Sequence, residues 1–245
     1  MIAARILGTA ALSLVCARAA YAIDVLPPDA ADGSRVALES TLDANTHHGG
    51  SIDASATFAP FGTIYDSGPR LRLVGGKSWY RYLANEDPRE TASGHGGEVG
   101  FLIGYGLSAP RVSVIGLIGP AFSYSRDAGV RRSFEGAKIV FSAYATPTDR
   151  TMTYISFTHS TIATTSLFQA KIGAKMPLGF YIGPEMNATW RQGNPLDTPV
   201  ATKRLGLHLS SIKLGPWYLS VSAGWMHEDE LGSGKYVGVS VYGGF

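Results

Sequence analysis

The amino-acid sequence predicts an all-β protein, a closed antiparallel transmembrane β-barrel of about 12 strands that follows a cleaved signal peptide. Three observations support this fold class. Hydrophobicity alternates with a period of two residues along most of the chain, the connections between these segments differ systematically in length, and the N-terminus carries an export signal.

The first 22 residues have the organisation of a secretory signal peptide. A positive charge at Arg5 precedes an apolar run over residues 6–17, and the small-residue pattern Ala20-Tyr21-Ala22 follows. We therefore expect cleavage before Ile23. A membrane anchor is the alternative, but the run is shorter than the ~20 residues that a spanning helix needs.

The only cysteine, Cys16, lies within this signal peptide. Lipoprotein attachment would favour a small residue before it, whereas Val15 is bulky. The mature chain therefore contains no disulfide, and we expect it to comprise a short lead over residues 23–34 and one barrel domain over residues 35–245.

The composition agrees with an exported barrel better than with a soluble domain. Charged residues make up 16% of the chain, against ~25% in typical soluble proteins, and glycine is abundant with 30 residues. Removal of Arg5 and Arg18 with the signal leaves 19 basic and 19 acidic residues. This balance, without a basic run, gives no indication of nucleic-acid binding.

Each predicted strand shows alternation of apolar and polar or small side chains, which is typical of a strand between two environments. In the closing strand, valines at 237, 239 and 241 share one face with Phe245, while Tyr236, Ser240 and Tyr242 share the other. We expect the valines to face lipid. The predicted strands lie near residues 35–44, 50–59, 70–75, 98–105, 111–124, 138–144, 151–162, 168–175, 180–191, 204–210, 217–225 and 235–245.

The predicted connections alternate between tight turns and long polar loops from the fourth strand onward. The tight ones are 106–110, 145–150, 175–179 and 213–216, and the long ones are 84–97, 125–136, 191–203 and 227–235. Only the link near residues 161–165 is shorter than this pattern requires. Outer-membrane barrels have short periplasmic turns on one rim and long external loops on the other, so the chain is predicted to be an outer-membrane protein of a Gram-negative bacterium.

Aromatic residues on the predicted outer face indicate where the membrane interfaces lie. Trp217 and Trp225 are eight residues apart, or ~20 Å along the axis of a tilted barrel, and Phe180 and Trp190 bracket another strand in the same way. We interpret these four residues as a membrane girdle; the alternative is that they belong to the core of a soluble β protein. Phe245 is predicted to form part of the signal that assembly machinery recognises.

The predicted lumen is rich in charged residues, with six cations against two acids. The residues that we single out in the lumen are Arg72, Glu98, Lys138, Tyr144, Tyr181, Glu185 and Tyr218. One interpretation is a polar filling of paired side chains, as in other small barrels. The other is a path or docking surface for a polar polymer, with the tyrosines as stacking platforms for sugar rings.

No motif in the sequence predicts a cofactor, and none of the six histidines has a metal-binding spacing. The adjacent His47 and His48 would leave a zinc shell incomplete. A lipid hydrolase is the enzymatic alternative, because His208 and Ser210 lie two residues apart on one strand. Alternation places both in the lumen, away from lipid esters, so we predict no catalytic residues.

The segments YIGPEMNATW (181–190), HLSSIKLGPWYLSVSAGW (208–225) and GKYVGVSVYGGF (234–245) resemble the BcsS family of bacterial cellulose-biosynthesis proteins. The resemblance extends weakly from about Ser34 to Phe245. It implies an accessory role in making, exporting or anchoring cellulose or a related exopolysaccharide at the outer membrane. The partners so implied are outer-membrane lipid, the assembly machinery, and cellulose or components of its synthesis; a purely structural or pore-forming barrel remains an alternative.

Overall fold

The computed structural model describes residues 33–83, 91–127, 130–191 and 200–245. The predicted signal peptide and residues 23–32 of the predicted lead lie outside the described residues.

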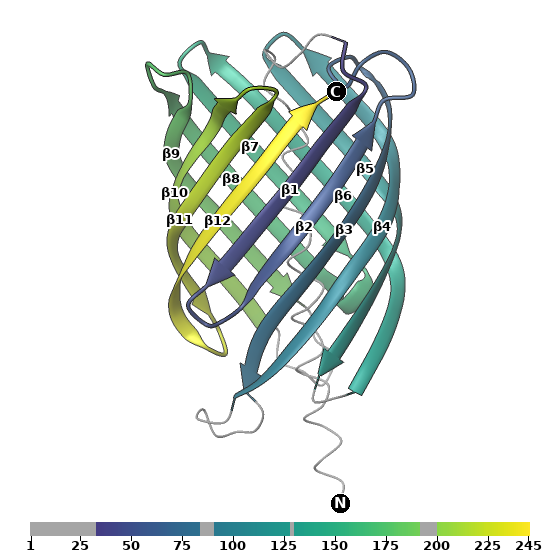
Figure 1. Cartoon of the computed structure of the whole chain (residues 1–245), viewed down its shortest axis with the longest axis vertical. Coiled ribbons are helices and arrows are strands. Elements are labelled where there is room, and N and C mark those ends of the chain that lie inside the picture. The colour runs from purple at the N-terminus through teal and green to yellow at the C-terminus, as the bar shows by residue number, and fades with distance from the viewer. Residues whose placement is uncertain (1–32, 84–90, 128–129, 192–199) are drawn as a thin grey trace, which may run out of the picture.

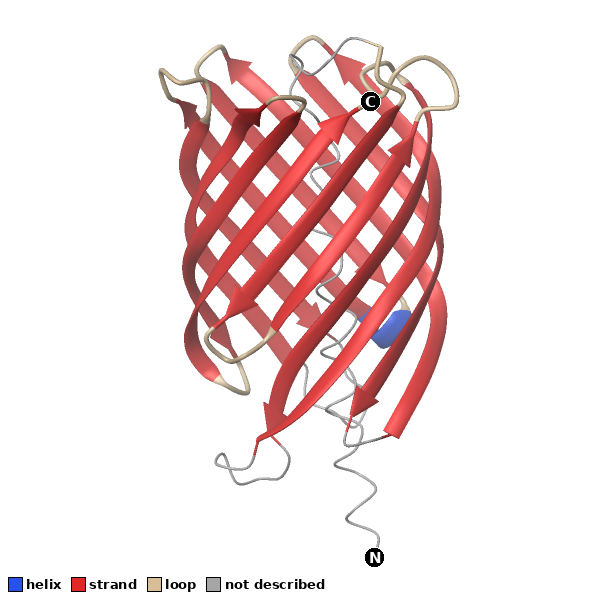
Figure 2. Ribbon diagram, viewed as in Figure 1, coloured by secondary structure: helices blue, strands red, loops and turns tan. Residues whose placement is uncertain are grey.

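Within the described chain, twelve antiparallel strands close into one barrel, as predicted (Figure 1). Each strand pairs with its neighbours in sequence, and β1 pairs with β12 to complete the circle. Among the described residues, the regular structure is entirely strand apart from one short 3-10 helix, η3 (Ile162–Thr164) (Figure 2). The strands are β1 (Val36–Asn45), β2 (Gly50–Phe58), β3 (Gly68–Leu83), β4 (Thr91–Ala109), β5 (Val112–Asp127), β6 (Val130–Thr148), β7 (Thr151–Ser160), β8 (Thr165–Lys175), β9 (Tyr181–Arg191), β10 (Val200–Leu214), β11 (Trp217–Glu228) and β12 (Gly232–Gly244).

The barrel has two rims, which we name by their connections. The turn rim holds the C-terminus, at the top of Figure 1, and the connections 59–67, 110–111, 149–150, 176–180 and 215–216. The loop rim lies at the opposite end. Its described connections are 46–49, 161–164 and 229–231, and the strands on either side of residues 84–90, 128–129 and 192–199 also end there.

The connections on the loop rim are shorter than the sequence predicts, because strands continue through the predicted loops. The β5–β6 pair extends to Asp127 opposite Val130, and the β11–β12 pair extends to Glu228 opposite Gly232. Backbone hydrogen bonding between antiparallel strands does not require an apolar face, so pairing continues where side chains have become polar. The nine-residue connection 59–67 lies on the turn rim, and loop length therefore distinguishes the rims less clearly than we predicted.

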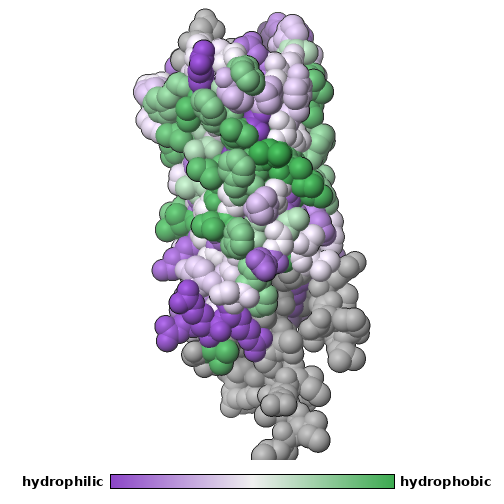
Figure 3. All heavy atoms as spheres, turned by 90° about the vertical axis from the view of Figure 1, so that its right-hand side faces the viewer, coloured by the Kyte–Doolittle hydropathy of each residue, from purple (hydrophilic) through white to green (hydrophobic). Residues whose placement is uncertain are grey.

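The outer face of the barrel is apolar and exposed. Leu205, Leu207 and Val99 expose 63%, 62% and 59% of their surface, and many other outward residues are comparable. In Figure 3, hydrophobic residues gather over the middle and upper wall, while hydrophilic residues dominate the lower end. Exposed apolar side chains on the outside of a closed sheet are suited to lipid, since closure also leaves no unpaired strand edge.

Among the described residues, no helix is both long and apolar enough to cross a membrane.

The seam between β1 and β12 fixes the C-terminus. The Phe245 backbone amide donates to the Val36 carbonyl at 2.8 Å, and the Phe245 carbonyl accepts from the amides of Arg35 and Val36. Its ring packs edge-on against Trp217, with centroids 5.0 Å apart. The chain therefore ends on a paired strand, as the apolar closing segment predicts.

Candidate functional site: the barrel interior

Alternate residues of each strand point into the barrel, and these carry most of the buried polar groups. All seven residues that the sequence analysis singles out for the lumen are buried, with exposed fractions between 1% and 7%. The structure brings Tyr144 and Tyr181 into one cluster with Met152 and Tyr154, and pairs Glu98 with Lys138. Arg72 and Tyr218 lie elsewhere on the inner wall, so the seven do not form one site.

A connected set of side chains, here called the inner network, covers the inner face of β8–β12 and β1. It consists of Asp43, Lys171, Glu185, Arg204 and Tyr236. The Arg204 guanidinium donates to both carboxylate oxygens of Asp43, at 2.7 and 3.0 Å, and lies over the Tyr236 ring at 4.9 Å. The Tyr236 hydroxyl donates to Glu185 Oε1 at 2.7 Å, and Lys171 Nζ lies 3.4 Å from Glu185 Oε2. Bidentate arginine–carboxylate geometry is among the strongest polar contacts in proteins.

Two glycines allow the inner network to form. Gly206 of β10 is paired with Glu185 of β9 on one side and with Gly224 of β11 on the other, and Gly224 is paired with Tyr236. A Cβ on Gly206 would collide with the Tyr236 hydroxyl and the Ala223 carbonyl. Since neither glycine has a side chain, the tyrosine can lie flat across two strands and reach Glu185.

Further ion pairs occupy the rest of the inner wall. Lys138 of β6 contacts Glu98 of β4, and both side chains are almost fully buried. Arg72 of β3 donates to Ser55 Oγ at 2.7 Å and lies 3.5 Å from Glu39. The sequence analysis does not include two inward-facing acids of β1, Glu39 and Asp43. Their neighbours Leu38 and Leu42 lie on the outer face, and this alternation could have predicted that the two acids face inward. The lumen is therefore closer to charge balance than the sequence analysis predicts.

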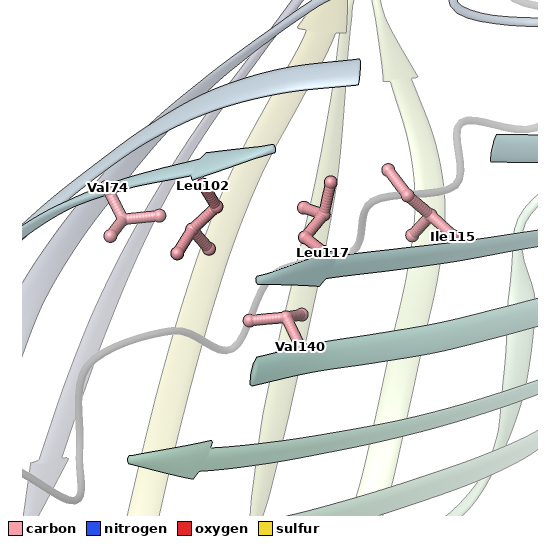
Figure 4. Close-up of a cluster of buried hydrophobic side chains, with 5 residues drawn as sticks. All are labelled: Val74, Leu102, Ile115, Leu117 and Val140. Atoms are coloured by element: carbon pink, nitrogen blue, oxygen red, sulfur yellow. The ribbon is translucent and has the colours of Figure 1, made fainter. Parts of the chain in front are cut away.

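One part of the inner wall is apolar rather than polar. Val74 of β3, Leu102 of β4, Ile115 and Leu117 of β5, and Val140 of β6 form a buried cluster (Figure 4). The sequence analysis did not predict this apolar patch. The β5 segment around Ile115 and Leu117 is apolar on both faces, so alternation alone does not distinguish the inside from the outside there.

A cavity of about 510 Å³, the turn-rim cavity, lies among inward side chains and turn residues at the turn rim. Two tyrosines, Tyr181 and Tyr218, and three cations, Arg111, Lys175 and Lys213, are among the residues that line it. Lys175 Nζ lies 5.9 Å from the Tyr181 ring centre, and Tyr218 stacks on Tyr242 with centroids 5.3 Å apart. Fixed aromatic faces beside flexible donors are suited to sugar rings, which have apolar faces and polar edges.

His208 and Ser210 are buried on the inner wall and in contact. The separation of His208 Nδ1 and Ser210 Oγ is 2.7 Å, and His208 Nε2 lies 3.1 Å from the Ile172 carbonyl oxygen. A carbonyl only accepts, so Nε2 carries the proton and donates, and the serine hydroxyl donates to Nδ1. This is the hydrogen-bonding pattern of a base and a hydroxyl, but it faces the interior and not the lipid.

The four predicted girdle residues lie near the ends of their strands. Trp217 begins β11 and Phe180 directly precedes β9, both at the turn rim. Trp190 and Trp225 lie near the loop-rim ends of the same strands and are 40% and 70% exposed. Phe157 of β7 is 6.3 Å from Trp190 between ring centres.

Comparison with known protein families identifies the chain. The family described as "Cellulose biosynthesis protein BcsS" matches residues 41–245, which is most of the sequence. The chain belongs to the BcsS family. The match to the BcsS family runs from within β1 to the end of β12 and so covers nearly all of the barrel. A comparison with curated proteins found no match.

Two solved structures illustrate how the BcsS chain compares with known barrels. A structure described as "KdgM porin" is similar at 13% identity and a TM-score of 0.47, covering 85% of this chain and 99% of that one. The translocator domain of the autotransporter NalP from Neisseria meningitidis is similar at 12% identity and a TM-score of 0.47, covering 89% and 90%.

Proposed function

We propose that the protein is an outer-membrane accessory barrel that acts in the export or anchoring of bacterial cellulose or a related exopolysaccharide. The observation that carries this proposal is the family match over residues 41–245. The closed barrel with an exposed apolar outer face supports a location in the outer membrane. Outer-membrane lipid, the assembly machinery and the cellulose-synthesis components are the partners that this proposal requires.

We place the contact with the glucan chain at the turn-rim cavity. Tyr181 and Tyr218 are two of the seven predicted lumen residues, and their rings line the same cavity as Lys175 and Lys213. A glucan can stack its ring faces on the tyrosines while its hydroxyl oxygens accept hydrogen bonds from the lysines. By contrast, Glu185 and Lys138 have buried charged partners, so we assign them a structural role.

The proposal is tested by deleting the gene and restoring it as wild type, as Tyr181→Ala/Tyr218→Ala, or as Tyr105→Ala. Tyr105 is an outward-facing residue with 53% exposure and serves as the matched aromatic control. Cellulose yield and attachment to the cell are measured, and heat-dependent gel mobility reports barrel folding. We expect the double variant to fold but to restore cellulose poorly, and the control to restore it fully. Normal cellulose in the deletion strain would contradict the accessory role and leave a purely structural or pore-forming barrel.

The position of the barrel is tested separately by cell fractionation. A barrel with an apolar outer face is expected to stay with washed outer membranes in high salt and to require detergent for release. Release by salt alone would contradict the membrane location.

A lipid hydrolase is the second candidate, because His208 and Ser210 form a hydrogen-bonded pair. We favour the accessory role, since both side chains face the interior and are at most 2% exposed. Ser210→Ala should leave the lipid composition of the membrane unchanged. A changed acyl-chain profile in that variant, with wild-type folding, would favour the enzyme.

A further inference from the structure

Charged residues on the outer face of the strands are confined to the loop rim. Six cations face outward there and are exposed, and we call them the basic belt: Lys77, Arg81, Arg126, Arg131, Lys203 and Lys235. Among outward-facing strand residues that the structure describes, Glu135 is the only acid at this rim, and no charged residue faces outward at the turn rim.

The basic belt lies at the edge of the apolar outer face. Lys235 of β12 is paired across the strands with the exposed Trp225 of β11. Lys203 of β10 is paired with His227, two residues after Trp225 in β11. The Arg131 guanidinium lies over the Tyr124 ring at 5.7 Å. None of the six cations forms an ion pair with a carboxylate of the described residues.

A crevice of about 510 Å³ joins the basic belt to the apolar face. Its lining includes Val99 and Phe122 from the apolar face, Tyr124, Arg131 and Glu135 from the rim, and the inward-facing Glu98, whose charge is paired with Lys138. Gly97 opens this crevice, because a Cβ there would collide with the Tyr124 ring. The crevice thus offers an apolar surface to a hydrocarbon chain and a guanidinium to an anionic group beside it, with Glu135 restricting the number of anions that fit.

We propose that the basic belt and this crevice bind lipopolysaccharide, through the phosphate groups and acyl chains of its lipid A. Phosphate suits arginine because the planar guanidinium donates two parallel hydrogen bonds. Short turns are periplasmic in such barrels, so the loop rim faces the outer leaflet, where lipid A supplies phosphates and acyl chains at this height. Phospholipids of the inner leaflet would instead meet the turn rim, whose strands carry no outward cations.

The test uses the full barrel, freed of bound lipid and refolded in detergent. Binding of diphosphoryl lipid A, dephosphorylated lipid A and phosphatidylglycerol is measured by native mass spectrometry and by the shift in unfolding temperature. We compare wild type with Arg126→Gln/Arg131→Gln, with the conservative Arg126→Lys/Arg131→Lys, and with Arg35→Gln/Arg150→Gln, two exposed residues at the turn rim, as the matched control. Unboiled gel mobility confirms that each variant is folded.

We expect wild type to bind diphosphoryl lipid A most tightly. The glutamine variant should bind it roughly thirty-fold more weakly, because each of the two interfacial cations contributes about 1 kcal/mol. The lysine variant should retain part of the affinity, and the turn-rim control should match wild type. Equal binding of phosphatidylglycerol, an equal loss in the control, or unchanged binding in the glutamine variant would each overturn the proposal. The cellulose phenotype is not used here, so failure of this test leaves the proposed function standing.

Discussion

The inner network makes a quantitative prediction for Glu185→Gln. The Glu185 side chain is fully buried, with Lys171 Nζ at 3.4 Å and the Tyr236 hydroxyl at 2.7 Å. Glutamine is nearly the same size and keeps an oxygen that can accept from Tyr236. The substitution therefore removes the negative charge and leaves the shape and one hydrogen bond in place.

The expected cost follows from what the substitution leaves behind. Lys171 is 6% exposed and would remain in the interior without its counter-charge. Removing one partner of a buried pair costs ~3–5 kcal/mol. The separation of 3.4 Å is longer than an ideal charge-assisted bond, so we expect the lower end, about 3 kcal/mol of unfolding free energy.

The assay is urea unfolding of the barrel in lipid vesicles, with cellulose yield measured in the complemented deletion strain. The double variant Lys171→Met/Glu185→Gln completes a double-mutant cycle. Because it removes both charges, it should recover most of the unfolding free energy that Glu185→Gln loses. Tyr236→Phe isolates the hydroxyl, and we expect it to cost about 2 kcal/mol as a bond to a charged group. Wild-type stability of Glu185→Gln together with defective cellulose would refute the reasoning, because the lumen would then be a working path and not a packed support.

Three further predictions concern other parts of the barrel. Gly206→Ala should destabilise the barrel by about 1–3 kcal/mol, because its methyl group would collide with the Ala223 carbonyl and the Tyr236 hydroxyl; Gly116→Ala, where a Cβ meets nothing within 4 Å, is the control, and equal unfolding curves would contradict the steric argument. Phe245→Ala should cost about 1 kcal/mol of stability through its lost contact with Trp217, but should reduce the amount of folded barrel in cells far more; a proportional loss of both would show that the residue is not an assembly signal. Hydrogen bonds from the backbone and hydroxyl of Thr63 lower the pKa of Asp66, so this carboxylate stabilises the connection 59–67 above its unfolded pKa, and the effect is lost as pH falls through the lowered value. The protection factor of the Thr63 amide, taken relative to the intrinsic exchange rate at each pH, should therefore fall in acid in wild type but be insensitive to acid in Asp66→Ala.

The sequence predicts the fold well where the two faces of a strand differ. In β12, the valines and the tyrosines alternate without interruption, and the structure places Val237 outside and Tyr236 inside. Strand ends are predicted less well. Arg126 and Arg131 are paired across β5 and β6, yet both are polar and lie beyond the apolar surface, so no alternation marks the strand there.

The interior could be predicted only in part, because contacts across the lumen depend on register. The sequence indicates that Glu185 faces inward, but not that Tyr236 of β12 reaches it over two glycines. Likewise, Asp43 lies 161 residues from Arg204 in the chain, and only the closed barrel brings them together. Residue types predict which side chains enter the lumen; the stagger of the strands decides which of them meet.

The ion pair between Asp43 and Arg204 has a consequence for how the barrel wall stays closed in the membrane. It joins β1 to β10 across β11 and β12, and so fastens the seam from inside, where Thr41 also meets Ser240 at 3.1 Å. Parting β1 from β12 would break a buried bidentate ion pair in addition to the backbone ladder. The wall therefore resists opening sideways into the bilayer, because the strands on both sides of the seam are held together from within as well as along their backbones.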